Sequence, residues 1–328
     1  MILAIETSCD ETCAAVCTPD GEVLSSVVAS QVTDHAAFGG VVPEIASRRH
    51  LELLSPTVIT ALREAGIDED QLTNVAVTGG PGLIGALLVG VSFAKGYAYA
   101  RGLPLIAVDH LHGHVASLQL AENPPSGAHL VLLASGGHTL LIDVADDGSL
   151  TTIARSMDDA AGEAFDKGAR LLGLGYPGGP ALGGLAGTAD PRTRAFTTPL
   201  HGRDDLAFSF SGLKTALALS VQSLAADDQF GRSELAASYQ EAIVTHLVER
   251  AELGLARTGR TTLGVVGGVA ANARLRDRLG ELWADVVLAP LSACGDNAAM
   301  IAMASRRLSP LTPNELTSLD AHARSPLG

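Results

Sequence analysis

The feature that most constrains this chain is a strand–turn–strand unit that occurs twice, at residues 3–21 and 130–148. Each copy reads as an apolar strand, a tight turn of small and polar residues, a second apolar strand and an Asp-Gly turn signal. Aligned without gaps, Ser8 matches Ser135, Thr12 matches Thr139, and Asp20-Gly21 matches Asp147-Gly148. A duplicated hairpin predicts two similar lobes around a central cleft, and a cleft between lobes is a usual site for a nucleotide or other small molecule.

Length and composition agree with two folded lobes. The chain has 328 residues, of which 47% are hydrophobic and 18% charged, so general disorder is excluded. The formal net charge of −14 argues against binding of nucleic acid through the overall charge of the chain. Any nucleic-acid contact is therefore expected to use local basic groups or a partner protein.

Three of the four cysteines, Cys9, Cys13 and Cys17, lie at four-residue spacing, which at first suggests a metal site. They fall on a strand–turn–strand segment, so their side chains are not expected to converge, and we interpret them as small reduced residues. Glu6 interrupts the first apolar stretch, and the apolar run at 83–94 is too short to span a membrane. A soluble cytoplasmic protein without a membrane segment is expected.

The order of elements predicts the same α/β layout twice. Residues 123–127, rich in Pro and Gly, mark a boundary between an N-terminal lobe at 1–125 and a C-terminal lobe with helical insertions at 126–328. Strands are expected at 2–7, 13–18, 22–30, 75–78, 105–108, 129–135, 138–144, 150–155, 262–266 and 285–288. Helices are expected at 44–65, 83–101, from 109, and at 159–172, 211–224, 234–257, 270–280 and 296–307.

Between these elements, residues 173–187 are expected to form a Gly-rich loop, and the turn-rich C-terminal residues to be poorly ordered. The whole pattern resembles the duplicated actin-like, sugar-kinase and Hsp70-type ATPase fold. In that fold the two hairpin turns clamp phosphates, and a late Gly-Gly turn, here Gly267-Gly268, holds an adenosine.

The two hairpin turns carry groups suited to chemistry. Asp10 and Glu11 are adjacent carboxylates that cannot both enter an apolar core. They are either a solvated turn or groups that orient a metal, a water or an attacking amine. The matching turn, Ser135 to Gly137, offers backbone N–H groups to a phosphate or acyl group.

A His-rich segment, Asp109-His-Leu-His-Gly-His114, is the strongest local signal. On a helix, His110 and His114 share one face and are well spaced to bind one metal ion, with Asp296 as a third, oxygen ligand. The alternatives are a solvated or core histidine pair and an Asp296 that only caps the last helix. The zinc-protease pattern His-Glu-x-x-His is absent.

Several further polar residues have both a functional and a structural interpretation. Asp166 could accept hydrogen bonds from ligand hydroxyls or pair with Lys167 or Arg170. Asn272 follows the Gly267-Gly268 turn and either contacts the adenosine or caps a helix. Acidic residues Asp158 and Asp159 suit a helix start. Basic residues cluster as solvated faces or RNA contacts at Arg48-Arg49-His50, at Arg274, Arg276 and Arg278, and at Arg306-Arg307.

Nine motifs together resemble the family of tRNA threonylcarbamoyladenosine-forming transferases, the TsaD family, formerly called O-sialoglycoprotein endopeptidases. They are Ile5-Glu-Thr-Ser-Cys-Asp-Glu-Thr12, Val42-Pro-Glu-Ile-Ala-Ser-Arg-Arg-His50, His110-x-x-x-His114, Ser135-Gly-Gly-His-Thr139, Asp158-Asp-Ala-Ala-Gly-Glu-Ala-Phe-Asp-Lys167, Tyr176-Pro-Gly-Gly-Pro180, Phe208-Ser-Phe-Ser-Gly-Leu-Lys214, Gly267-Gly-Val-Ala-Ala-Asn272 and Asp296-Asn297. They occur in the family's order.

The resemblance implies transfer of a threonylcarbamoyl group from threonylcarbamoyl-adenylate to the exocyclic amine of the adenosine 3′ of the anticodon in tRNAs reading ANN codons. It implies that His110, His114 and Asp296 hold one divalent metal ion, usually iron and sometimes zinc. It also implies an adenylate site made of Leu133, Ala134, Ser135, Gly136, Gly137, Asp166, Gly179 and Asn272. Some relatives have an Asp where this chain has Gly183.

For catalysis, we expect Asp10 with Glu11 to remove the proton from the attacking amine. The resemblance further implies a TsaB-type paralogue and a TsaE-type P-loop ATPase as partners. Three alternatives come from other classes. A silent paralogue scaffold would lack the His pair that this chain has, and a metallopeptidase would need a glutamate base that the His motif of this chain lacks. A phosphoryl-transfer kinase of the same fold would need a substrate signature that nothing in the chain matches.

Overall fold

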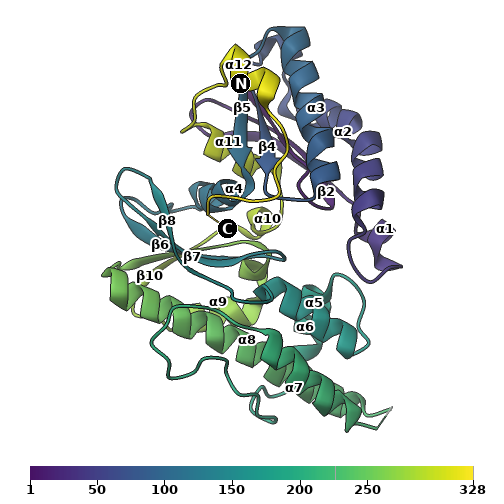
Figure 1. Ribbon diagram of the computed structural model, residues 1–328, viewed down its shortest axis with the longest axis vertical. Helices are drawn as coiled ribbons and strands as arrows, with labels where there is room; N and C mark the ends of the chain where they lie inside the picture. The colour runs from purple at the N-terminus through teal and green to yellow at the C-terminus, as the bar shows by residue number, and fades with distance from the viewer. Residues whose placement is uncertain (226, 328) are drawn as a thin grey trace. The chain divides into compact units, whose positions relative to one another are not determined.

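The computed structural model describes residues 1–225 and 227–327, which form two compact units. Unit 1 comprises Met1–Leu120 and Gly295–Leu327, and unit 2 comprises Ala121–Cys294. Each unit is built on a mixed five-stranded sheet that carries helices (Figure 1). The predicted duplication is therefore present as two α/β units.

The sheet of unit 1 has the strand order β3-β2-β1-β4-β5. Its strands are β1 (Ile2–Glu6), β2 (Glu11–Cys17), β3 (Val23–Ser30), β4 (Asn74–Gly80) and β5 (Leu105–Asp109). β1 pairs antiparallel with β2 and parallel with β4, so it lies in the middle and all five of its residues are buried. Such near-continuous apolar sequence is typical of a strand covered on both faces.

Helices cover both faces of this sheet. The helices of unit 1 are α1 (Val32–Ala36), α2 (Pro43–Ala65), α3 (Ile84–Arg101), α4 (His110–Ala116), α11 (Ala298–Ser305) and α12 (Pro313–Ser318), with 3-10 turns at Glu69–Gln71 and Ser117–Leu120. Leu3 and Ile5 pack with residues of α2 and α3, whereas Ile2 and Ala4 pack with α11. This division follows from the alternation of side chains along a strand.

Unit 2 repeats the same strand order in its own sequence, because its sheet reads β10-β9-β6-β7-β8. Its strands are β6 (His129–Ala134), β7 (Thr139–Val144), β8 (Leu150–Arg155), β9 (Thr262–Val266) and β10 (Asp285–Leu288). Its helices are α5 (Ala161–Leu171), α6 (Gly178–Ala186), α7 (Ser211–Gln222), α8 (Gln229–Thr258), α9 (Ala273–Leu279) and α10 (Leu291–Cys294), with a 3-10 turn at Gly268–Ala271. In both units the first strand is central.

Two expectations about irregular segments are wrong. The predicted loop at 173–187 contains α6, because Leu182 and Ala186 are buried and their packing outweighs the poor helix propensity of glycine. The C-terminal residues also have defined contacts: α12 is present, and the His322 N–H donates to the Gly79 carbonyl at 3.0 Å. Among residues 1–225 and 227–327, no helix combines the length and apolar character that crossing a bilayer requires.

The chain returns to unit 1 at its C-terminal end. The sequence-based division assigned all of 126–328 to the second lobe, whereas Gly295–Leu327 groups with unit 1. The physical reason is α11, whose Met300 and Ile301 are completely buried among residues of β1, β2, β4 and β5. This return brings Asp296 to the unit that carries the histidine pair.

Candidate functional site

The histidine pair lies on α4, at the carboxyl end of β5. The helix begins there because the Asp109 side chain caps it, accepting hydrogen bonds from the N–H groups of Leu111 at 2.9 Å and His112 at 3.2 Å. Because His110 and His114 are four residues apart on this helix, their rings lie close together, with 4.6 Å between the ring centroids. The expected helical placement of the pair is present.

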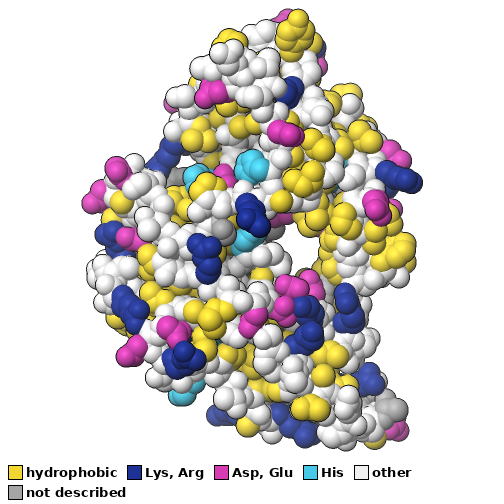
Figure 2. Space-filling model, in the orientation of Figure 1, with side chains coloured by type: hydrophobic (Ala, Val, Ile, Leu, Met, Phe, Trp, Pro, Cys, Tyr) yellow, Lys and Arg dark blue, Asp and Glu magenta, His cyan; other side chains and the backbone are white. Residues whose placement is uncertain are grey.

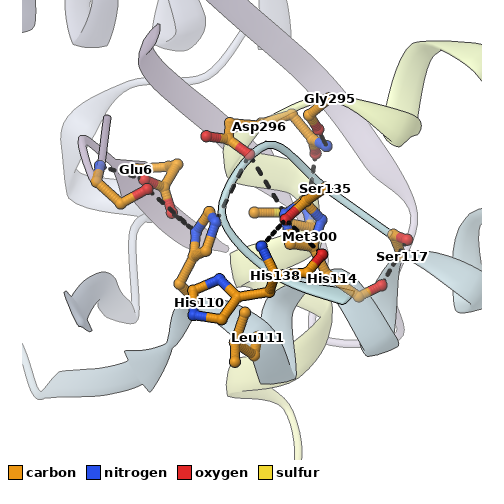
Figure 3. A network of polar contacts seen from close by, with 12 residues as sticks. Glu6, His110, Leu111, His114, Ser117, Ser135, His138, Gly295, Asp296 and Met300 are labelled. Atoms are coloured by element: carbon orange, nitrogen blue, oxygen red, sulfur yellow. Dashed lines mark hydrogen bonds and ion pairs between the residues drawn. The ribbon is translucent and has the colours of Figure 1, made fainter. Parts of the chain in front are cut away.

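Asp296 completes a cluster with these histidines. Its Oδ1 lies 3.6 Å from His110 Nε2 and 3.3 Å from His114 Nε2, and one ligand atom of each residue falls within 4.8 Å of the others (Figure 3). The helix cap next to it is Asn297, whose Oδ1 accepts from the Met300 N–H at 2.9 Å. The structural alternative for Asp296, capping α11, is therefore wrong.

The donor set fits a divalent metal ion. His114 is completely buried, and within the described residues neither of its ring nitrogens has a hydrogen-bond partner. An unpartnered buried nitrogen is costly, and a metal ion bound to it would remove that cost. Burial lowers the pKa of His110, but the carboxylates of Glu6 and Asp296 outweigh this effect and raise it to about 9. Two imidazoles and one carboxylate suit zinc or iron.

The cysteines do not belong to this cluster. All four are free thiols, and the ligand group of the described residues consists of two histidines and one aspartate. Burial raises the pKa of Cys13 and Cys17, both on β2, so their protonated forms are favoured. The interpretation of these residues as small reduced side chains is confirmed.

Glu11 is the first residue of β2, directly after the first hairpin turn, and its environment is unusual. Its Oε1 accepts a hydrogen bond from Ser30 Oγ at 2.9 Å, whereas Oε2 is buried and, among the described residues, has no partner. Burial raises the pKa of Glu11 to about 7, with repulsion from Asp10 and Asp296 in the same direction. Asp10 lies beside it in the turn, and the Asp10 carbonyl accepts from the Gln31 N–H at 3.1 Å.

A buried network holds this turn against α2. His50 is completely buried; its Nε2 lies 3.0 Å from the Cys9 carbonyl and its Nδ1 2.7 Å from Thr12 Oγ1. The Nε2–H therefore donates to Cys9, and Nδ1 accepts from the threonine hydroxyl. The expectation that Arg48-Arg49-His50 is a solvated face is wrong for His50, because these hydrogen bonds satisfy the ring in the core.

Unit 2 contains a cavity of about 690 Å³. Four of the residues that the sequence assigned to the adenylate line it: Gly136, Asp166, Gly179 and Asn272. The other four lie beside it along the chain. Leu133 and Ala134 are the last, buried residues of β6, and Ser135 and Gly137 belong to the β6–β7 turn. The cavity has the size of a small-molecule site.

Local contacts explain how the cavity wall is built. Thr139 Oγ1 accepts from the Ala161 N–H at 2.8 Å and so starts α5 next to the β6–β7 turn. A Cβ at Gly162 would lie 2.6 Å from the Ser135 carbonyl oxygen, so only glycine permits this approach. Asp166 Oδ1 accepts from the Gly178 N–H at 2.9 Å, which joins α5 to α6.

The other side of the cavity is formed by Asn272 and its partner. Asn272 caps α9 by accepting from the Leu275 N–H at 3.0 Å, so its structural interpretation is confirmed. Its Nδ2 also donates to Gln240 Oε1 at 2.8 Å, and both residues line the cavity. A Cβ at Gly183 would lie 3.5 Å from Gln240 Oε1 and 3.7 Å from Asn272 Nδ2, so position 183 faces this amide pair.

The other charged residues that had both a functional and a structural interpretation make structural contacts. Lys167 pairs with Asp159 and Glu163, each at 2.8 Å, whereas Asp158 accepts from the N–H groups that begin α7. Arg274 and Arg278 both pair with Glu241. Arg276 donates to the Ala270 carbonyl at 2.7 Å and the Ala289 carbonyl at 2.8 Å. This arginine cluster is therefore engaged within unit 2.

Sequence reasoning missed two residues of these sites. Gln240 lies in the middle of α8, where a glutamine gives no signal in a single sequence. Glu6 stands in the first family motif and interrupts an apolar stretch, but it was assigned no role of its own from the sequence. It is completely buried and its Oε2 accepts from His110 Nδ1 at 2.9 Å. A carboxylate inside a buried strand was the available signal, because such a charge needs partners.

Comparison with known proteins agrees with these features. The sequence model described as TsaD, tRNA N6-adenosine threonylcarbamoyltransferase, matches residues 22–303. The chain is 46% identical over 325 residues to a protein of that name from Desulforapulum autotrophicum, covering 98% of this chain and 97% of the relative. It is 49% identical over 308 residues to one from Anaeromyxobacter dehalogenans, covering 92% of each.

Solved structures support the fold. An activator of 2-hydroxyisocaproyl-CoA dehydratase from Clostridium difficile matches with a TM-score of 0.55 at 11% identity, over 97% of this chain and 96% of that one. Full-length HypF matches with a TM-score of 0.58 at 16% identity, over 99% of this chain and 47% of that one. The two units thus have the actin-like ATPase fold. The chain belongs to the TsaD family of tRNA N6-adenosine threonylcarbamoyltransferases.

Proposed function

We propose that this enzyme transfers a threonylcarbamoyl group from threonylcarbamoyl-adenylate to the exocyclic amine of the adenosine 3′ of the anticodon in tRNAs reading ANN codons, and that the transfer depends on a metal ion. The observation that carries the metal dependence is the cluster of His110, His114 and Asp296, in which Asp296 Oδ1 lies 3.3 Å from the buried His114 Nε2 and no described residue hydrogen-bonds to His114 Nδ1. A resident metal ion would supply Lewis-acid and template chemistry to the carbamoyl and phosphate oxygens.

The proposed reaction forms a bond between the adenosine N6 and the carbamoyl carbon, and breaks the bond from that carbon to the AMP oxygen. The amine loses a proton as AMP leaves. Glu11 and Asp10 are our candidates for accepting it. The pKa of about 7 for Glu11 supports this role, because a carboxylate with that pKa is both ionised in part at neutral pH and basic enough to take a proton.

The cavity of unit 2 is the proposed site of the adenylate. Its size and its lining by Asp166 and Asn272, which offer hydrogen-bonding groups to ribose hydroxyls and base edges, support this assignment. The turn from Ser135 to Gly137 would place backbone N–H groups where negative charge develops during transfer. Leu133 and Ala134, at the end of β6, would anchor that turn in the sheet.

A TsaB-type paralogue and a TsaE-type P-loop ATPase are the proposed partners, and the cytoplasm the proposed location. The formal net charge of −14 supports a need for help in binding tRNA. On the face drawn in Figure 2, lysine and arginine side chains lie singly or in small groups among acidic and apolar ones. Strong electrostatic binding of RNA needs more contiguous positive charge.

Reconstitution tests the proposal. The chain is combined with purified partners, threonylcarbamoyl-adenylate and unmodified tRNA, and the nucleosides are analysed by mass spectrometry. His110→Ala is the test variant and His112→Ala, on the same helix but outside the ligand cluster, is the matched control. We expect threonylcarbamoyladenosine from the wild type and the control, and none from His110→Ala.

The other outcomes separate the alternatives. Equal amounts of product from the wild type and His110→Ala would support the transfer reaction but refute its dependence on the metal ion. No product from any form, with the adenylate intact and the partners active, would favour the silent scaffold. A metallopeptidase is disfavoured by the residues between the histidines, Leu111-His112-Gly113, which include no glutamate base.

A further inference from the structure

A buried carboxylate stands directly behind one member of the histidine pair. Glu6 ends β1 and is completely buried, in a strand that is otherwise apolar. Taking a charge out of water is unfavourable unless donors surround it. Glu6 has three donors: its Oε1 accepts from the Ser8 N–H, and its Oε2 accepts from Thr78 Oγ1 at 2.6 Å and from His110 Nδ1 at 2.9 Å.

This contact determines which nitrogen of His110 carries the proton. A carboxylate accepts hydrogen bonds and cannot donate them, so Nδ1 must carry a proton, and a metal ion that binds the ring has to replace any proton on Nε2. Nε2, on the opposite side of the ring, is then left to bind a metal ion, and it is the atom that lies 3.6 Å from Asp296 Oδ1. Figure 3 shows the His110 ring between the carboxylates of Glu6 and Asp296.

The ring is held from two further directions. Ser8 Oγ lies 3.2 Å from the same Nδ1, and Thr78 fixes Glu6 itself from the neighbouring strand β4. The carboxylate therefore has little freedom to turn away from His110. His114 differs, since within the described residues its nitrogens have no hydrogen-bond partner, and its Nε2 lies 3.3 Å from Oδ1 of the Asp296 carboxylate. The two histidines of one cluster are thus oriented by different means.

From this arrangement we infer that Glu6 is a positioning residue of the metal site. It holds His110 in the tautomer that presents Nε2 to the ion, and it adds a second negative charge behind the ligands. The inference rests on the proposed metal site. Hydrogen-bonded carboxylates of this kind orient metal-binding histidines and raise their basicity, and their loss typically weakens metal binding 10–100-fold.

Metal affinity is the direct test. The purified chain is stripped of metal, then titrated with Zn²⁺, and with Fe²⁺ without oxygen, in competition with a chromophoric chelator. Glu6→Gln keeps the size of the side chain but removes its charge and one acceptor atom. We expect it to bind either metal about 10–100-fold more weakly than the wild type.

Thr78→Val is the matched control. It removes one hydrogen bond from the same Glu6 oxygen, in the same buried place, while the carboxylate and its contact with His110 remain. We expect its metal affinity to stay within about threefold of the wild type, although its unfolding temperature should fall. A purely structural role for Glu6 would lower stability in both variants and leave metal affinity unchanged in both.

Each outcome is decisive. Wild-type affinity in Glu6→Gln would overturn the inference and leave the metal site standing, whereas failure of the wild type to bind metal would overturn both. Should Glu6→Gln not fold, histidine-selective ¹⁵N NMR of the zinc-loaded wild type decides instead. The His110 signals are assigned as those that shift in Thr78→Val. We expect His110 to carry its proton on Nδ1 and to bind the metal ion through Nε2. A metal on Nδ1 would refute the positioning role.

Discussion

The replacement Glu11→Gln tests whether burial keeps this carboxyl protonated in the folded chain up to about neutral pH. Burial raises the pKa of Glu11 from 4.5 to about 7. Below pH 4.5 the group is protonated in both the folded and the unfolded chain, and the shift has no effect on stability. Between pH 4.5 and 7 the unfolded chain releases this proton first, so stability falls as the pH rises.

The size of the effect follows from the shift. Each pKa unit corresponds to about 1.4 kcal/mol, so the full shift from 4.5 to about 7 gives an upper bound of roughly 3 kcal/mol. Because the side chain is only half-buried, solvent screening reduces the expected value to about 1–2 kcal/mol. Gln cannot ionise, so this pH-dependent loss should be absent from Glu11→Gln.

Urea unfolding at pH 5 and pH 8 measures the difference. We expect the stability of Glu11→Gln relative to the wild type to increase by about 1–2 kcal/mol between the two pH values. Any pH-independent loss of stability caused by burying the Gln amide is the same at both pH values and therefore cancels. The control is Glu22→Gln, an exposed position next to the turn at the other end of the hairpin. An equal stability difference at pH 5 and pH 8 for Glu11→Gln would refute the reasoning.

Three further predictions concern the proposed reaction and its two sites. Asp10→Ala should abolish or strongly slow tRNA modification in the reconstituted assay, and full turnover would remove Asp10 from the mechanism. Gly178→Ala should weaken adenylate binding in calorimetry, because a Cβ there would lie 2.6 Å from the Asp166 Cα and push α6 from α5. Gly184→Ala, with open space around its Cβ, should bind normally. Zn²⁺ at 100 times its dissociation constant should stabilise the wild type against unfolding by about 2.7 kcal/mol, and should not stabilise His114→Ala. Thermal unfolding with and without Zn²⁺ measures this, and an equal rise in unfolding temperature for both proteins would argue against the site.

Much of this fold could be predicted because its signals are local. The repeated hairpins, the buried strands and the stop at Gly66 after α2 all follow from periodicity and turn chemistry. The helix α6 could not be predicted, because its residues are held by packing on α5 that no local pattern reveals. Tertiary contacts of this kind override local propensity.

The candidate sites could likewise be predicted only where their signals are local. Helical spacing placed His110 beside His114, and the turn chemistry pointed to Asp10 and Glu11. The partner of His110, Glu6, lies 104 residues away along the chain, so only strand pairing brings the two together. The raised pKa of Glu11 likewise depends on its burial, and a sequence does not give the depth at which a residue lies.

The return of the C-terminal segment to unit 1 has a consequence for biosynthesis. The ribosome makes β1, β2, β4 and β5 early, but the helix that covers one face of their sheet, α11, begins only at Ala298. Until then that apolar face lacks its native cover, as in other folds whose contacts span long stretches of chain. Asp296 emerges at the same late stage, so the proposed metal site can form only after unit 2 has been synthesised. Metal loading would then follow the synthesis of unit 2.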